Sequence, residues 1–149
     1  MYLALGLFNH TQQHAESVYN IDVSDVQEMI DNMQDECTLE CVELEGESVA
    51  VKSFGELCKL VQWIEENTRE NVDAIVDFVN CFSVHDLNNY NDAFTGCTNF
   101  SEYAAEYADD CILCDIDKNH PARLYFDYDS FENDLRHDHT VGVFVWRNI

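Results

Sequence analysis

The residues best suited to hold a metal ion are two cysteines, Cys111 and Cys114, and two histidines further along the chain, His137 and His139. Thiolate and imidazole groups in this combination are typical zinc ligands. The pattern is weak, because strong zinc signatures bring two closely spaced pairs together, whereas these cysteines stand three residues apart at the expected end of a helix. We therefore expect no metal here, and small buried thiols in its place.

A second partial pattern resembles the start of a calcium-binding loop. Oxygen-bearing side chains occupy its first, third and fifth positions, at Asp115, Asp117 and Asn119. A calcium loop then needs a glycine and, at position twelve, a bidentate glutamate. His120 and Phe126 stand at these two positions. A regulated calcium site is therefore not expected.

Motifs of common catalytic machinery are absent from the sequence. There is no Gly-x-Ser-x-Gly segment and no glycine-rich phosphate loop, and the chain has only five glycines. Carboxylates are so numerous that no pair stands out as a general acid and base. A Cys–His nucleophilic pair stays open, although no local pattern favours one. We expect a protein that is not an enzyme and uses no cofactor.

The first third of the chain predicts a small sheet with one helix. The apolar segment 2–8 indicates a buried strand, which residues 18–21 continue or pair with. Asp22 is a suitable N-cap for a short helix whose apolar residues, between 23 and 33, fall at helical spacing. Alternating apolar and polar residues over 39–52 indicate a hairpin.

Capping residues divide the middle of the chain into helices. Ser53 and Glu56 form a capping-box pattern at the start of a helix that runs to about Glu66. A second helix is expected from about Thr68, and Ser83 opens a shorter third helix that ends near Gly96.

The last third predicts two more helices and a strand. Asn99 caps a helix that turns Phe100, Tyr103, Ala104 and Tyr107 inward. His120 and Pro121 mark a loop or a first helical turn. Asp127 caps a helix through about Leu135, and the β-branched and aromatic segment 140–146 indicates a closing strand.

These elements predict an α+β fold, elongated, with three small lobes. The lobes are an N-terminal α+β lobe (1–52), a central helical lobe (53–97), and a C-terminal lobe of helices with a short sheet (98–149). Apolar residues make up 46% of the chain and aromatic residues 12%, with a single proline, so the chain is expected to fold despite its charge.

The seven cysteines are expected to be reduced and mostly buried, in a cytoplasmic protein. The apolar start of the chain is only seven residues long and has no basic flank, so it does not match a signal peptide. No segment approaches the length of a membrane span. Cys37 and Cys41, four residues apart, offer even less support for a metal site than the Cys111 pair.

The strongest signal is the charge, because 30 Asp and Glu stand against 7 Lys and Arg, a net charge of -23. The acids are spread along the chain, and residues 1–50 hold eleven of them with no Lys or Arg. Such a surface repels nucleic acid and acidic membranes. It favours a cation or a protein with a large basic cleft as partner. An ordinary acidic protein that is merely kept soluble by self-repulsion is the alternative.

The density of this charge is comparable with that of DNA. Duplex DNA carries one charge per about 1.7 Å, so 23 charges match roughly 12 base pairs, about 40 Å of duplex. The candidate partner-binding residues are carboxylates on the expected helix faces and in neighbouring loops. They are Glu65, Glu66, Glu70, Asp73, Asp77, Asp86, Asp92, Glu102, Glu106, Asp109, Asp110, Asp115, Asp117, Asp127, Asp129, Glu132 and Asp134. Each alone also fits a solvated helix face, so the hypothesis depends on the whole set.

Three regions of the chain, the last of them made of two nearby segments, resemble the ArdA family of antirestriction proteins in order and spacing. Residues 124–135 (LYFDYDSFENDL) and the ending 143–146 (VFVW) are similar to the family's YxDYxxFxxDL segment and VxVF strand. Residues 53–67 (SFGELCKLVQWIEEN) are similar to its SLEEVxxLxxLIEE helix, and residues 1–9 to its opening strand. The segment 10–19 departs from the family, because it lacks the family's glycines and its tryptophan.

This resemblance implies an elongated, commonly dimeric DNA mimic made of three small lobes. Such proteins block type I restriction–modification enzymes by filling the DNA groove of their methyltransferase and specificity subunits, in the bacterial cytoplasm. A CRISPR effector or another nucleic-acid-binding defence complex is an alternative target, because it also offers a basic channel. From other classes, an acidic metal-binding module and a small cysteine-dependent enzyme remain as alternatives.

Overall fold

The computed structural model describes residues 1–33 and 35–149 and has a mixed α+β fold, as the sequence predicts. The chain forms two compact units, Met1–Tyr90 and Asn91–Ile149. The sequence predicts three lobes, with a first boundary at 52/53. In the structure the residues on both sides of that position belong to the first unit, because the apolar stripe of the helix that begins at Phe54 is buried with the sheet.

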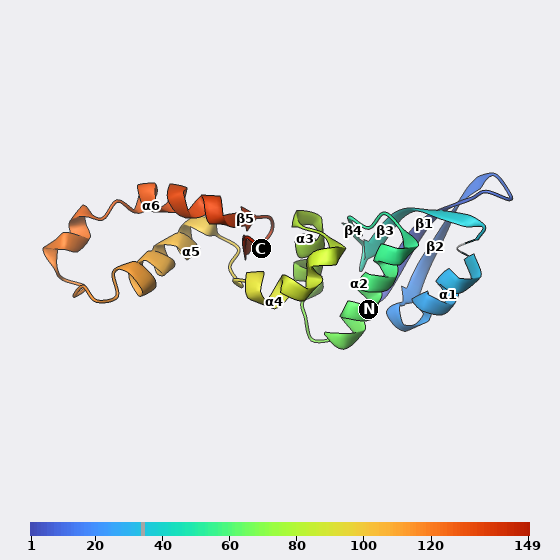
Figure 1. The fold of residues 1–149 in the computed structure, drawn as a ribbon, viewed down its shortest axis with the longest axis horizontal. Helices are drawn as coiled ribbons and strands as arrows, with labels where there is room; N and C mark the ends of the chain where they lie inside the picture. The colour runs from blue at the N-terminus through green and yellow to red at the C-terminus, as the bar shows by residue number, and fades with distance from the viewer. Residues whose placement is uncertain (34) are drawn as a thin grey trace. The chain divides into compact units, whose positions relative to one another are not determined.

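The first unit contains an antiparallel sheet with the strand order β2-β1-β3-β4 (Figure 1). Its strands are β1 (Tyr2–Asn9), β2 (His14–Asp22), β3 (Cys37–Leu44) and β4 (Glu47–Val49). Alternation places Leu3, Leu5 and Leu7 on the buried face of β1. Glu45 and Gly46 connect β3 to β4 with φ angles of 50° and 91°, which a tight two-residue hairpin turn requires.

Strand β2 begins earlier than its sequence pattern indicates. The expected strand covered residues 18–21, but the structure pairs β2 with β1 from His14 onward. The turn before it is held by Asn9, whose side-chain oxygen accepts hydrogen bonds from the backbone N–H groups of Thr11 and Gln12 at 3.0 and 2.9 Å. The pairing extends the strand through a polar segment that has no apolar alternation of its own.

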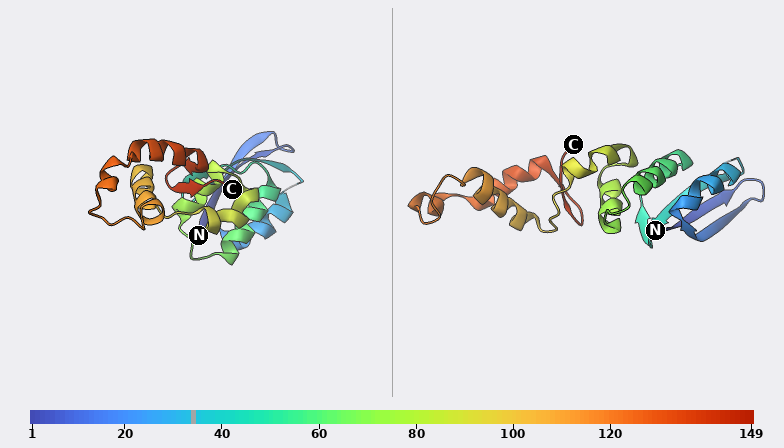
Figure 2. Two further views of the ribbon diagram at one scale, coloured as in Figure 1. Left: turned by 60° about the vertical axis from the view of Figure 1, so that its left-hand side comes forward. Right: turned by 90° about the horizontal axis from the view of Figure 1, so that it is seen from below.

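Helices pack beside and over this sheet. The helical elements of the unit are η1 (Val23–Asp25), α1 (Val26–Met33), α2 (Phe54–Glu66), α3 (Val72–Cys81) and η2 (Val84–Asn89), followed by the short α4 (Tyr90–Ala93), which begins at the last residue of the unit. Figures 1 and 2 show α1 and α2 side by side over the sheet. The expected helix from Thr68 begins at Val72 instead, because Asn71 is its N-cap and accepts from the N–H of Asp73 at 2.8 Å.

The predicted N-caps of this unit are confirmed. Asp22 accepts a hydrogen bond from the backbone N–H of Ser24 at 3.0 Å, and Ser53 accepts one from Glu56 at 3.2 Å. These caps satisfy backbone donors that a helix start leaves without an intrahelical partner. The sequence therefore indicated where these helices begin.

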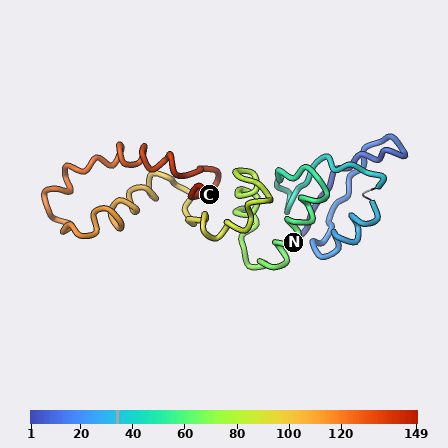
Figure 3. The backbone as a smooth tube through the Cα atoms, viewed as in Figure 1, coloured from blue at the N-terminus to red at the C-terminus, as the bar shows by residue number. Residues whose placement is uncertain are grey.

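The second unit is a pair of helices followed by a hairpin. Its elements are α5 (Phe100–Tyr107), a π turn η3 (Ala108–Ile112), η4 (Pro121–Tyr125), α6 (Tyr128–Leu135), η5 (Arg136–Asp138), β5 (His139–Val141) and β6 (Val145–Arg147). Figure 3 shows the chain running out along α5, reversing, and returning along α6, and the two helices are in contact. The core between these elements contains Phe100, Tyr103, Ala104 and Val145.

Two sequence expectations for this unit are wrong. The expected single strand over 140–146 is a hairpin, because the chain turns at residues 142–144 and pairs Thr140 with Trp146. The N–H of Gly142 donates to the carbonyl of Phe144 at 2.9 Å within this turn. Tyr107, expected to face inward, is 36% exposed because it lies at the end of α5.

The helices of the described residues are short. The longest of them, α2, has 13 residues, and none of them combines the length and apolar character needed to cross a membrane.

Candidate functional site

Most carboxylates of the chain lie at its surface. Of the 30 Asp and Glu, 23 are exposed, 6 are half-buried and 1 is buried. The first unit has 18 acidic residues against 3 basic ones, a net charge of -15, and the second has 12 against 4, a net charge of -8. Each unit therefore presents a strongly negative surface on its own.

Most of the predicted partner-binding residues belong to this surface. Thirteen of the seventeen are exposed: Glu65, Glu66, Asp73, Asp92, Glu102, Glu106, Asp109, Asp110, Asp115, Asp117, Asp127, Asp129 and Asp134. Three are half-buried, Glu70, Asp86 and Glu132. The structure thus keeps the set as a distributed surface on two separate units, and does not gather it into one pocket.

Asp77 is the exception, and its predicted outward orientation is wrong. It is buried, with 8% of its surface exposed. The reason is that α3 is enclosed over a full run, because every residue from Ala74 to Val79 is buried. Burial raises the pKa of the neighbouring Cys81 thiol, and the charge of Asp77 raises it further. Asp77 is therefore part of the interior and not of a partner-binding face.

Two half-buried carboxylates of the first unit interact with their own fold. Asp86 accepts a hydrogen bond from the hydroxyl of Ser83 at 2.7 Å, at the start of η2. Tyr90 is buried against Trp63 and Phe78, with ring centroids 5.1 and 5.4 Å apart. The second carboxylate is that of Glu70, which lies near the Tyr90 hydroxyl. Burial raises the pKa of Tyr90, and the charge of Glu70 raises it further.

In the second unit, two carboxylates of the predicted set are paired with arginine. Asp109 accepts from Arg123 at 3.2 Å and from the hydroxyl of Tyr128 at 2.7 Å. Its hydrogen bond raises the pKa of Tyr128. Glu132 lies 2.7 Å from the guanidinium of Arg136. The negative charge of Asp109 and Glu132 is therefore partly compensated within the chain.

The sequence-based set omits an acidic group on the sheet. Strands β3 and β4 and the turn between them carry four exposed glutamates, Glu40, Glu43, Glu45 and Glu47. The signal for them was the excess of acids over residues 1–50. Helix-face patterns do not select these residues, because they lie in strands and a turn.

The thiols are less buried than predicted, which corrects the sequence interpretation. Cys37 is buried, but Cys41, Cys111 and Cys114 are exposed, and all seven cysteines are free thiols. The Cys111 pair is exposed because it lies beyond Ala108, where the packed stripe of α5 ends, and Ile112 beside it is 51% exposed.

No metal site forms from these cysteines in the described residues. Within residues 1–33 and 35–149, no three His, Cys, Asp or Glu side chains come together as metal ligands. Both ring nitrogens of His139 already have protein partners, the carbonyl of Leu135 at 2.9 Å and the hydroxyl of Tyr103 at 3.1 Å. This histidine instead joins the end of α6 to α5.

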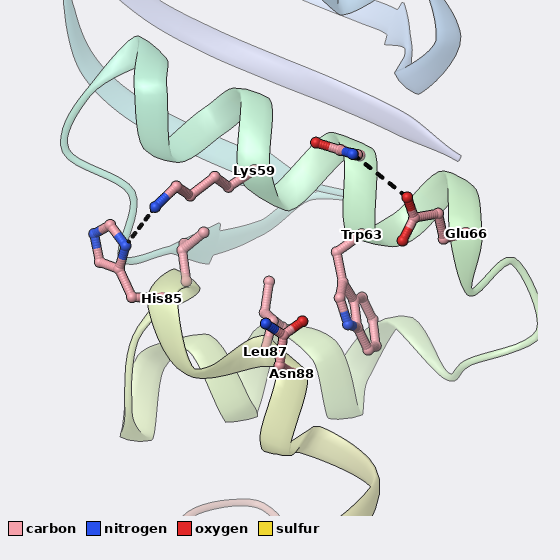
Figure 4. A pocket seen from close by; sticks show the side chains of 8 residues that line it. Lys59, Trp63, Glu66, His85, Leu87 and Asn88 are labelled. Carbon is pink, nitrogen blue, oxygen red and sulfur yellow. Dashed lines mark hydrogen bonds between the residues drawn. The ribbon is translucent and has the colours of Figure 1, made fainter.

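A hollow of about 270 Å³ lies between α2 and η2 of the first unit (Figure 4). The ammonium group of Lys59 is 2.9 Å from Nδ1 of His85, whose Nε2 is 3.6 Å from Glu56. With Nδ1 accepting from lysine, the proton of a neutral imidazole lies on Nε2, toward the carboxylate. This chain of groups links the two helices, and Trp63 and Leu87 form apolar walls beside it.

Comparison with known proteins gives no family for this chain. No protein-family model matches the sequence, and a search of curated proteins finds no relative.

Proposed function

We propose that this protein is a non-catalytic DNA mimic, which occupies the DNA-binding groove of a type I restriction–modification enzyme and so acts as an antirestriction protein. The observation that carries the proposal is the exposure of 23 of its 30 carboxylates, on both units, against seven Lys and Arg. A basic cleft built for phosphate would bind such a surface and release counterions, as it does with DNA.

The pattern of pairing also favours a partner outside the chain. In the part of the chain that the structure describes, the arginine ion pairs to side chains are those of Asp109 and Glu132. A surface in which most acids have no internal cation is under strong self-repulsion. Binding to a basic cleft would relieve this repulsion. The resemblance of residues 53–67 and 124–146 to ArdA proteins points to the type I methyltransferase and specificity subunits as that cleft.

The proposal includes the setting that the resemblance implies. The protein would act in the cytoplasm of a bacterial host, as a homodimer, and would need no cofactor. It would not bind nucleic acid or membranes directly, because its charge has the same sign as theirs.

The decisive experiment is competition for a purified type I methyltransferase. A fluorescently labelled target duplex is bound to the enzyme, and this protein is titrated in while anisotropy is followed at several salt concentrations. We expect displacement of the duplex and an apparent affinity that falls steeply with salt, as for DNA itself. Tight binding that leaves the duplex in place would contradict mimicry.

The target is tested in the same format. A nucleic-acid-guided CRISPR effector replaces the methyltransferase, with its own labelled substrate. Displacement from the effector alone would keep the mimicry and change the target. Displacement from neither enzyme would contradict the proposed function.

A further inference from the structure

The two most exposed large apolar side chains of the described residues are adjacent in sequence. Leu124 is 86% exposed and Tyr125 is 87% exposed, at the end of η4 in the second unit. Isolated apolar residues are common on protein surfaces, but two neighbouring large side chains with almost no cover forgo most of their burial energy. This dipeptide therefore calls for an explanation.

The turn that carries them is firmly held. Pro121 begins η4, and the N–H of Ala122 donates to Nδ1 of His120 at 3.1 Å. The guanidinium of Arg123 donates to the carbonyls of Leu113 at 2.7 Å and Ile116 at 2.9 Å. These contacts fix the turn to the loop that precedes it.

Arg123 also explains why its two neighbours are exposed. Its side chain is only 15% exposed, because it crosses the loop and pairs with Asp109 at 3.2 Å. The arginine anchors the turn through its own hydrogen bonds, while Leu124 and Tyr125 have almost no contact with the rest of the chain. An apolar pair on a fixed turn loses little conformational entropy on binding.

The charge around Leu124 and Tyr125 favours one class of partner. Five exposed aspartates flank it in the chain: Asp110, Asp115, Asp117, Asp127 and Asp129. The bases of the same stretch are Lys118 and the paired Arg123. A second copy of this turn, a nucleic acid or an anionic membrane would be repelled. A protein pocket that is apolar at its base and basic at its rim is complementary.

We propose that Leu124 and Tyr125 form an apolar anchor that inserts into a pocket within the basic, DNA-binding cleft of the partner protein. Binding energy in protein interfaces concentrates in a few such side chains, with tyrosine prominent among them, while surrounding charges steer the encounter. The inference rests on the proposed function and adds an element that DNA lacks, a contact whose strength does not depend on salt.

The test compares the Leu124→Ser/Tyr125→Ser double variant with the unchanged protein in the methyltransferase competition assay. We expect affinity to fall about tenfold to hundredfold at every salt concentration. The slope of log affinity against log salt should be unchanged, because no charge is lost. Tyr19→Ser is the matched control, since Tyr19 is 68% exposed in the other unit, and it should bind like the unchanged protein.

The stability of the double variant tests the same inference without a partner. Its thermal midpoint should stay within a few degrees of that of the unchanged protein, because exposed side chains contribute little to folding. A large decrease would show that the pair packs on its own chain, and would overturn the inference.

The outcomes separate the two proposals. Binding of the double variant within twofold of the unchanged protein overturns the anchor and leaves DNA mimicry standing. Equal loss in the Tyr19→Ser control also overturns it, because the effect would then not belong to this turn. If the unchanged protein binds neither the methyltransferase nor the CRISPR effector, the proposed function fails and the anchor fails with it.

Discussion

The guanidinium of Arg123 lies 3.2 Å from the carboxylate of Asp109, fourteen residues earlier in the chain. Asp109 is thus both part of the acidic surface and a structural partner, because the hydroxyl of Tyr128 donates to the same oxygen at 2.7 Å. This pair joins η3 to η4, and the Tyr128 hydroxyl extends the contact to the start of α6. Replacing Asp109 by a neutral residue would therefore alter the fold of this region as well as its charge.

Replacing Arg123 by alanine should destabilise the second unit by about 2 kcal/mol, because the carbonyls of Leu113 and Ile116 would lose charged donors. Arg123→Lys should recover only part of this loss, since an ammonium group cannot reproduce the planar fork of guanidinium. Urea unfolding followed by circular dichroism measures the difference. Arg147→Ala is the matched control, because Arg147 is exposed and donates one long bond of 3.3 Å. Equal effects at both arginines would contradict this explanation.

Neutralising exposed carboxylates of α5 and η3 should weaken partner binding without unfolding the protein. The triple variant Glu102→Gln, Glu106→Gln, Asp110→Asn removes three exposed charges and leaves the Asp109 pair intact. Exposed charges contribute roughly 0.2–1 kcal/mol each, so we expect a loss of about tenfold at low salt and a shallower salt slope.

The control for this triple variant keeps its charge and changes only side-chain length. Glu102→Asp, Glu106→Asp, Asp110→Glu should bind within about twofold of the unchanged protein in the methyltransferase competition assay. If either variant abolished binding completely, a specific site would replace the distributed surface.

Asp127 should make the stability of α6 depend on pH in the acid range. The backbone N–H of Ser130 donates to its carboxylate at 3.0 Å and lowers the pKa of Asp127 below its ordinary value of 3.8. A lowered pKa in the folded state means that the stabilisation is complete above pH 3.8 and is lost as the pH falls through the folded-state pKa. The thermal midpoint of Asp127→Ala should therefore lie below that of the unchanged protein at pH 7, and the gap should narrow as the pH is lowered from 3.8 to 2.

Asn is the matched replacement, because it caps helices as well as Asp and does not titrate. Asp127→Asn should retain its advantage over Asp127→Ala at both pH values. If the gap between the unchanged protein and Asp127→Ala stayed constant down to pH 2, the cap would not be the source of the dependence.

The exposed thiols should react much faster than the covered ones. Cys41, Cys111 and Cys114 are exposed, whereas burial raises the pKa of Cys37 and Cys58. Thiolate is the reactive form, so we expect alkylation of the covered thiols at pH 8 to be at least about tenfold slower. Mass spectrometry after timed iodoacetamide treatment measures each rate, and unfolding in urea, which should equalise the rates, is the control. Rapid labelling of Cys37 in the native protein would contradict the packing of the sheet.

Local signals in the sequence predicted four capped helix starts, but not that of α3, which begins at Val72 and was expected from about Thr68. The caps at Asp22, Ser53, Asn99 and Asp127 depend on a side chain and backbone within three residues, so they can be recognised without a fold. The closing hairpin was missed because its apolar residues read as one strand until the turn after Val141 separates them.

The acidic surface was only partly predictable. Composition gave the sign and size of its charge, and the predicted set contains thirteen of its 23 exposed carboxylates. The predicted outward orientation of Asp77 is wrong, because the side of α3 that carries it is enclosed by other parts of the fold, which helix periodicity does not reveal. The sequence did not predict the pairing of Asp109 with Arg123. The two residues are separated by a loop whose course depends on hydrogen bonds from Arg123 to the carbonyls of Leu113 and Ile116.

The sequence by itself determined the charge, the α+β composition and the capped helix starts, because each depends on residue type or on neighbours within one turn. Only the tertiary structure decided which carboxylates are exposed, which are paired, and that Leu124 and Tyr125 stand uncovered beside an anchored Arg123. These properties depend on contacts between residues far apart in the chain, and burial and pairing are set by what those contacts leave open to water.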